Sequence, residues 1–125
     1  MDWKLELIFV PVSDVDRAKD FYVNKVGFNA DYDERPGGGI RFVQLTPPGS
    51  ACSICIGEGI NDAPPGTAPS LQIVVADIQA AHKQLADNGV EVSDVDVQAW
   101  GNFVYFADPD GNKWALQSMA SRPNG

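Results

Sequence analysis

The sequence predicts an α+β fold in which two βαβββ modules form a curved mixed sheet around a cavity, with the helices outside. Two repeated patterns lead to this prediction. Residues 7–22 and 70–85 each read as an apolar strand followed by a helix, and residues 40–56 and 102–117 each read as two alternating strands around a Pro/Gly turn. Internal repeats of this kind indicate stacked structural units. One such module is too small to bury both faces of its sheet, so we expect the two modules to pair.

The first strand and helix of each half carry the same signals. Ser13 or Asp14 can cap the first helix by accepting hydrogen bonds from its free amide groups. Asp77 follows Asp14 by 63 residues and takes the same place in the second half. Each helix ends near a glycine, Gly27 or Gly89. Apolar residues recur at helical spacing after each cap, namely Val15, Ala18, Phe21 and Tyr22 in the first helix and Ile78, Ala81 and Leu85 in the second.

The remaining strands and turns also correspond. Gly111 follows Gly49 by 62 residues, in the turn between the last two strands of each half. Residues 28–33 and 90–97 are expected to supply the one further strand that each module needs. Residues 33–39, DERPGGG, read as a turn or flexible tip.

A chain of 125 residues is expected to form a single domain, residues 1–125. Within it we expect module one at about 1–60, a linker at about 61–69 and module two at about 70–120. The linker, NDAPPGTAP, contains three prolines, which interrupt both helices and strand ladders.

Charge and hydropathy exclude several classes of protein. The net charge is −8, from 17 acidic and 9 basic residues, which argues against binding to nucleic acid because that binding rests on Lys and Arg. No apolar run approaches the roughly 20 residues that cross a bilayer, so no membrane partner is expected. The N-terminus lacks the pattern of a signal peptide, and we expect a cytoplasmic protein.

The chain contains a CxxC motif, formed by Cys52 and Cys55, within an alternating run that is typical of a strand. Residues three apart on a strand point to opposite faces of the sheet. We therefore expect two reduced thiols rather than a disulfide or a shared metal ion.

Two segments, LIFVPVSDVDRAKDFYVNKVGF (7–28) and FADPDGNKWALQ (106–117), closely resemble the vicinal oxygen chelate superfamily, also called the glyoxalase/bleomycin resistance/dioxygenase family. The resemblance covers nearly the whole chain. It implies paired βαβββ modules, the architecture that the internal repeat predicts independently. It also implies a divalent metal ion in the enzymes of the family, held by His, Gln or Glu from the first and last strands of each module.

The resemblance places the metal-ligand positions of this chain at Leu7 and Ser53 in module one and at Ser70 and Ala115 in module two. Leucine and alanine have no donor atom, and neutral serine hydroxyls are weak ligands. A catalytic metal ion typically needs about three protein ligands. We therefore expect no metal ion and no cofactor, and the catalytic residues, if there are any, stay unknown.

Other side chains do not rescue the metal site. Gln72 and Gln117 share a face with Ser70 and Ala115, but two amides without a histidine or carboxylate form a weak site. The only histidine, His82, falls in the second helix, where we expect a partly exposed surface residue.

Strand alternation predicts which side chains line the cavity. Aromatic and aliphatic walls with a few hydrogen-bonding groups are typical of a small-molecule site. The alternative is that these side chains simply fill the interior of a curved sheet. The predicted ligand-binding residues are Leu7, Phe9, Phe42, Gln44, Ser53, Ser70, Gln72, Trp100, Phe103, Tyr105, Ala115 and Gln117.

The leading functional hypothesis is a metal-free protein that holds a flat or aromatic small molecule and is not an enzyme. The resemblance to antibiotic-binding members of the family implies antibiotic resistance and a homodimer with ligands in grooves between the subunits. One alternative is a metal-dependent lyase, isomerase or dioxygenase with unconventional ligands. Another is a metal-free enzyme that uses Tyr105, Glu58 or Asp62 as acid or base.

Overall fold

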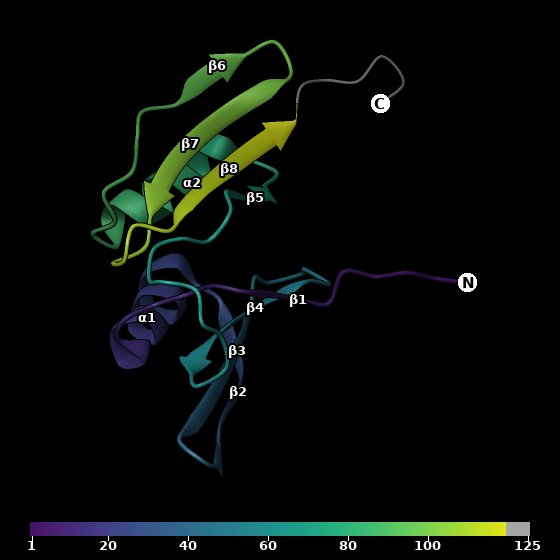
Figure 1. The fold of residues 1–125 in the computed structure, drawn as a ribbon. Helices are drawn as coiled ribbons and strands as arrows, with labels where there is room; N and C mark the ends of the chain where they lie inside the picture. The colour runs from purple at the N-terminus through teal and green to yellow at the C-terminus, as the bar shows by residue number, and fades with distance from the viewer. Residues whose placement is uncertain (120–125) are drawn as a thin grey trace.

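The computed structural model describes residues 1–119 and contains two modules of the same architecture (Figure 1). Residues 120–125, the end of the expected domain, lie outside the described residues. Module one comprises β1 (Leu7–Phe9), α1 (Val15–Asp20), the π-helical segment η1 (Phe21–Val26), β2 (Asn29–Gly37), β3 (Ile40–Thr46) and β4 (Ser53–Glu58). Module two comprises β5 (Leu71–Val74), α2 (Ile78–Asp87), β6 (Asp96–Gln98), β7 (Gly101–Ala107) and β8 (Lys113–Met119).

Each module forms its own four-stranded mixed sheet. The strand order is β1-β4-β3-β2 in sheet one and β5-β8-β7-β6 in sheet two, so the two orders match position by position. The first strand of each module pairs in parallel with the last, and the other pairs are antiparallel. The predicted α+β fold with two βαβββ modules is confirmed.

The helix signals in the sequence act as expected. Asp14, rather than Ser13, caps α1, because its carboxylate accepts a hydrogen bond from the backbone amide of Arg17 at 3.0 Å. Asp77 caps α2 through the amide of Ala80, also at 3.0 Å. Gly27 ends η1 in the left-handed region with φ of 99°, a conformation that glycine adopts without steric cost.

Two predicted boundaries were wrong. Residues 33–39 are not a turn throughout, because β2 continues to Gly37 and is held by its backbone pairing with β3. Residues 90–97 are mostly irregular, and only β6 joins the sheet there. In this stretch Val90 is buried, and Val92 and Val95 pack against the core. The apolar residues of this stretch therefore serve to pack against the core and do not indicate a strand with a ladder of hydrogen bonds.

The core lies between the sheets and the helices. In both sheets, alternate residues of the central strands point toward the helices and are almost fully buried, as strand geometry requires. These residues are Val43, Leu45, Ile54 and Ile56 in sheet one, and Val104, Phe106, Trp114 and Leu116 in sheet two. The large aromatic and aliphatic side chains of sheet two thus lie on its helix side.

The modules are joined by a buried network around Asp108. Tyr22 of η1 is completely buried and donates its hydroxyl to the Asp108 carboxylate at 2.7 Å. The indole nitrogen of Trp114 donates to the same hydroxyl at 2.9 Å. Burial, together with the neighbouring Asp108 carboxylate, raises the pKa of the Tyr22 phenol well above its usual value. The phenol therefore stays neutral and links the two modules as a donor and an acceptor.

The rest of the DPDGN turn, residues 108–112, holds the start of module one. Asp110 accepts hydrogen bonds from the amide and the hydroxyl of Ser13, at 3.1 and 2.6 Å. The Asn112 amide donates to the carbonyl of Pro11 at 2.9 Å and accepts from the amide of Ala68 at 3.0 Å. The turn whose sequence resembles a family motif thus serves as the connector between the modules.

A second ion network covers the outer edge of sheet one. Arg41 is 6% exposed, and its guanidinium donates to both oxygens of Asp33, at 3.0 and 2.9 Å, and to Asp16 at 2.8 Å. Lys19 donates to Asp33 at 2.9 Å. Hydrogen bonds from Arg41 and Lys19 hold the pKa of the Asp33 carboxyl well below its usual range.

Replacing Arg41 by methionine is expected to lower the free energy of unfolding by about 1–3 kcal/mol at neutral pH, because three charge-assisted hydrogen bonds are lost. A carboxyl with a lowered pKa stabilises the fold above its unfolded pKa of about 3.9, and this contribution is lost as the pH falls below that value. The difference between wild type and Arg41→Met should therefore shrink in acid. Urea denaturation across the acidic range measures it.

Arg35→Met is the matched control for this prediction. Arg35 is exposed and lies 3.8 Å from an exposed oxygen of Glu58. An exposed pair of this kind is worth at most about 1 kcal/mol. Equal losses for the two variants, or a difference that does not change with pH, would contradict the assigned role of Asp33.

No helix within residues 1–119 is both long and apolar enough to cross a membrane.

Candidate functional site

Each sheet has one face turned toward the helices and one face turned away, which we call its open face. Within a single chain the modules meet on the helix side, through Tyr22, Asp108 and Trp114. The open faces are consequently accessible in part: Ser53, Cys55, Phe103 and Gln117 on them are buried, whereas several apolar side chains are exposed. Phe9 is 42% exposed, Tyr105 43% and Val74 61%. Figure 1 also shows the segment before β1 projecting away from both sheets.

The open face of sheet one contains five of the predicted residues. The register places Leu7 beside Ser53 and Phe9 beside Cys55 in the parallel pair. Gln44 lies opposite Cys55 in the antiparallel pair, and Phe42 lies two positions along the same strand on the same face. The prediction from alternation thus places Leu7, Phe9, Phe42, Gln44 and Ser53 on one surface, which β1, β3 and β4 provide.

Ser53 is the polar centre of this face. Its hydroxyl accepts a hydrogen bond from the Gln44 amide at 3.2 Å and lies 2.6 Å from the Thr46 hydroxyl. Thr46 is also hydrogen-bonded to Asp31 at the edge of the sheet. Ser53 is 4% exposed, so this small network satisfies a polar group that would otherwise be buried without a partner.

The open face of sheet two contains the aromatic part of the site. Tyr105 lies opposite Ala115, and Phe103 opposite Gln117. Gln72 pairs with Ala115 across the parallel ladder. The rings of Phe103 and Tyr105 are nearly parallel, with an interplanar angle of 8° and centroids 6.2 Å apart. Phe103 is buried, whereas Tyr105 is 43% exposed and offers an accessible ring on which a planar ligand can stack.

Amide groups mark the centre of sheet two. The Gln72 amide donates to the side-chain oxygen of Gln117, and the Gln117 amide donates to the carbonyl of Trp100 at 3.2 Å. Gly101 allows this approach, since an added Cβ would lie only 2.9 Å from the Gln117 amide nitrogen. The Trp100 side chain is 62% exposed at the turn between β6 and β7.

Tyr105 has a carboxylate partner that sequence reasoning missed. Its hydroxyl donates to Asp96 of β6 at 2.7 Å, and Gln98 donates to the same carboxylate at 2.9 Å. These hydrogen bonds lower the pKa of Asp96, and the Asp96 bond raises the pKa of Tyr105. No pairing register was predicted for the expected strand at 90–97. The only indication in the sequence that Asp96 could contact Tyr105 was that the two residues lie close together in the chain.

Three predicted residues lie around one hollow of about 450 Å³, namely Ser70, Tyr105 and Ala115. Lys113 also lines this hollow. Ser70 precedes β5 and lies outside the ladder. Because the predicted set is divided between two sheets that meet on their helix sides, the two open faces form separate surfaces of one chain.

The four positions that the family resemblance assigns to metal ligands do not fit a metal ion. Leu7 and Ala115 have no donor atom, Ser70 offers only a neutral hydroxyl, and the Ser53 hydroxyl is engaged with Thr46 and Gln44. Within residues 1–119, no group of three or more His, Cys, Asp or Glu side chains is arranged to hold a metal ion.

The two cysteines differ sharply in environment. Both are free thiols, Cys55 is 1% exposed on the open face of sheet one, and Cys52 is half-buried just before β4. Burial raises the pKa of the Cys55 thiol to about 11. We expect a disulfide-based thiol reagent to react with one thiol per native chain at about pH 8, where Cys55 stays protonated.

Counting the released chromophore with and without denaturant tests this thiol prediction, and Cys52→Ser provides the control. Reaction of both thiols at equal rates in the native protein would contradict it.

The chain belongs to the Glyoxalase/Bleomycin resistance protein/Dioxygenase superfamily, whose sequence profile matches residues 4–116. Among solved structures it is similar to TnmS3, an antibiotic binding protein from Streptomyces sp. CB03234, with 35% identity and a TM-score of 0.86 over 95% of this chain and 98% of that one. It is also similar to a glyoxalase/bleomycin resistance protein from the same organism, with 37% identity and a TM-score of 0.80 over 91% and 99%. The uncharacterized protein YetH of Bacillus subtilis (strain 168) is 29% identical over 88% of this chain and 93% of its own.

Proposed function

We propose that this protein binds a flat or aromatic small molecule on its open faces without a metal ion, and that it acts as a binding protein rather than an enzyme. The observation that carries the proposal is the exposed ring of Tyr105, stacked on the buried ring of Phe103 and flanked by neutral amide groups rather than by metal ligands. The similarity to TnmS3 supports an antibiotic as the class of ligand.

The binding unit in this proposal is a homodimer. In one chain the two open faces do not close over a common cavity, and several large apolar side chains are exposed on or beside them. Exposed apolar surface of this extent often marks an interface. A second copy that places its open face against the first would enclose the ligand between the subunits. The exposed residues concerned are Leu5, Phe9, Val74, Tyr105 and Met119.

Isothermal titration calorimetry with a panel of planar antibiotics and dyes tests the proposal. We expect saturable binding of at least one polycyclic aromatic compound, with a stoichiometry of one ligand per chain. Quenching of tryptophan fluorescence should accompany binding, because Trp100 is exposed beside the site whereas Trp114 is buried. Removing Trp3 by Trp3→Phe leaves Trp100 as the exposed reporter.

Two results would count against the proposal. One is the absence of saturable heat across a chemically broad panel. The other is one tightly held divalent metal ion per chain in elemental analysis of the purified protein, which would favour the metal-dependent enzymes of the family. Light scattering measures the dimer separately, so that a monomer which binds ligand contradicts only the proposed assembly.

A further inference from the structure

The boundary between the modules has two sides, which the internal repeat relates to one another. On the first side, the DPDGN turn of module two closes over the start of α1 and over Tyr22. On the second side, the repeat places Leu85 where module one has Tyr22. It also places Pro47 and Pro48 where module two has Pro109 and Asp110. The second side has therefore lost the phenol and the acidic turn that seal the first.

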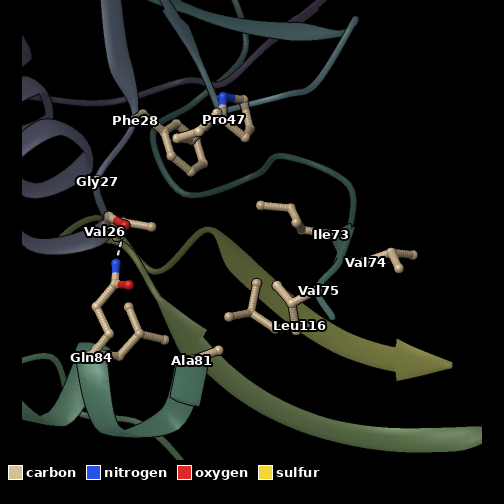
Figure 2. Close-up of a pocket in the computed structure, with 12 residues that line it drawn as sticks. Val26, Gly27, Phe28, Pro47, Ile73, Val74, Val75, Ala81, Gln84 and Leu116 are labelled. Carbon is tan, nitrogen blue, oxygen red and sulfur yellow. Dashed lines mark hydrogen bonds between the residues drawn. The ribbon is translucent and has the colours of Figure 1, made fainter. Parts of the chain in front are cut away.

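A cavity of about 220 Å³ occupies the second side, which we call the repeat cavity (Figure 2). Figure 2 shows Ala81 and Gln84 of α2, Leu116 of β8 and Ile73 of β5 around it, with Phe28 and Pro47 of module one opposite. Most of the lining is aliphatic. A charged ligand would lose its hydration here without a charged partner, so the cavity favours neutral molecules.

The repeat also indicates the shape of the occupant. At the equivalent place in module one, the Tyr22 ring fills the space between η1 and sheet two, stacks on Phe28 and contacts Trp114. Leu85 lacks both the ring and the hydroxyl. The volume agrees with one ring, since an apolar protein cavity of about 150 Å³ holds benzene. Larger ligands typically need at least about 300 Å³.

One polar side chain at the cavity has a spare acceptor. The Gln84 amide nitrogen donates to the carbonyl of Val26 at 3.1 Å, which orients the amide. Among the described residues no donor is hydrogen-bonded to the other amide atom, Oε1. The oxygen therefore remains available to accept a hydrogen bond from a hydroxyl or N–H group of a ligand.

We propose that the repeat cavity binds a small neutral aromatic molecule with one hydrogen-bond donor, such as a phenol. The ring takes the place that Tyr22 occupies in module one, and its hydroxyl donates to Gln84 Oε1. This site lies on the helix side of the sheets, with only Val74 of the open faces at its edge, and it stands or falls independently of the function proposed for those faces.

Titration of methyl-labelled protein with p-cresol, followed by NMR, tests the site. We expect saturable shifts at the methyl groups of Leu85, Ile73 and Leu116, with a dissociation constant on the order of 1 mM, as one ring in a partly open cavity allows. Toluene, which has the ring without the hydroxyl, should bind about fivefold more weakly to wild type, because Gln84 gains no hydrogen bond. Gln84→Met should remove this preference.

Two variants fill the cavity by different routes. Leu85→Tyr restores the residue of module one, and Ala81→Leu adds bulk from the partly exposed side of α2. Each is expected to weaken p-cresol binding at least about tenfold. Lys83→Ala is the control, since Lys83 lies on the same helix with a side chain that is 77% exposed, and binding should not change.

The outcomes of the titration distinguish loss of the cavity from loss of the fold. Circular dichroism verifies that each variant is folded, and Ala81→Leu keeps the test decisive if Leu85→Tyr does not fold. The proposal is overturned if the three methyl groups show no saturable shift in wild type, or if the same shifts persist in a folded filling variant. Shifts confined to the open-face residues would place p-cresol at the other site and would also overturn it.

Discussion

Replacing Asp108 by alanine is expected to lower the free energy of unfolding by about 3–5 kcal/mol, the largest effect of any single substitution considered for this protein. The Asp108 carboxylate is 5% exposed and accepts four hydrogen bonds. They come from the Tyr22 hydroxyl, the Asn112 side-chain amide, and the backbone amides of Asp110 and Asn112. Alanine leaves these donors buried without partners and loosens the turn that joins the modules.

Urea denaturation followed by far-ultraviolet circular dichroism measures this loss, provided that the transition stays two-state. Tyr22→Phe removes one hydroxyl from the same network and should cost less, about 1–3 kcal/mol. Asp87→Ala is the control, because Asp87 pairs with Lys83 on the surface of α2 with a side chain that is 61% exposed. A loss below about 1 kcal/mol for Asp108→Ala would show that the DPDGN turn is not the main connector.

The second large effect concerns ligand binding. Tyr105→Ala is expected to weaken the binding of a planar ligand at least about tenfold, because it removes one of two stacked rings from the open face of sheet two. Stability should change little, since Tyr105 is 43% exposed. Calorimetry with the tightest ligand of the panel provides the measurement.

Two further variants sharpen this prediction. Tyr105→Phe keeps the ring but loses the hydrogen bond to Asp96, so it separates stacking from the orientation of the ring. Val97→Ala is the control, because Val97 is 75% exposed on the neighbouring strand and its alternation with Asp96 places it on the opposite face. Unchanged affinity in Tyr105→Ala would remove sheet two from the proposed binding surface.

The sequence predicted the modules well because their signals are local. A cap such as Asp14, a glycine stop such as Gly27, and the strict alternation of burial in β3 depend only on residues close in the chain. The internal repeat then provided two independent examples of each signal. Residues that alternate along a strand could be assigned to faces correctly, because the period of a strand leaves only two choices.

The less predictable features depend on contacts between distant parts of the chain. The extent of β2 and β6 is set by pairing with their neighbours, and exposed residues such as those of β2 carry no apolar pattern to reveal it. The DPDGN sequence indicates a turn, but the contact of Asp108 with Tyr22 joins residues 86 positions apart. Likewise, Asp96 acquires its place beside Tyr105 only through the register of β6 and β7.

The candidate site also combines local features that the sequence predicts with contacts between distant residues that it does not predict. Alternation placed Leu7, Phe9 and Tyr105 on the faces turned away from the helices, and the structure places them there. How the two faces lie relative to one another depends on packing between modules, and alternation carries no information about it. The repeat cavity could not be predicted from the sequence either, since it is the space that the side chains of Leu85 and Pro48 leave unfilled between the modules.

The network around Asp108 lies wholly on the helix side, whereas the exposed aromatic side chains lie on the opposite faces of the sheets. Stability and the proposed ligand binding thus depend on different amino acids. Mutations at Phe9, Trp100 or Tyr105 can accumulate with little penalty to folding. In a protein organised in this way, the ligand specificity can change rapidly during evolution, while selection on a separate set of residues preserves the fold.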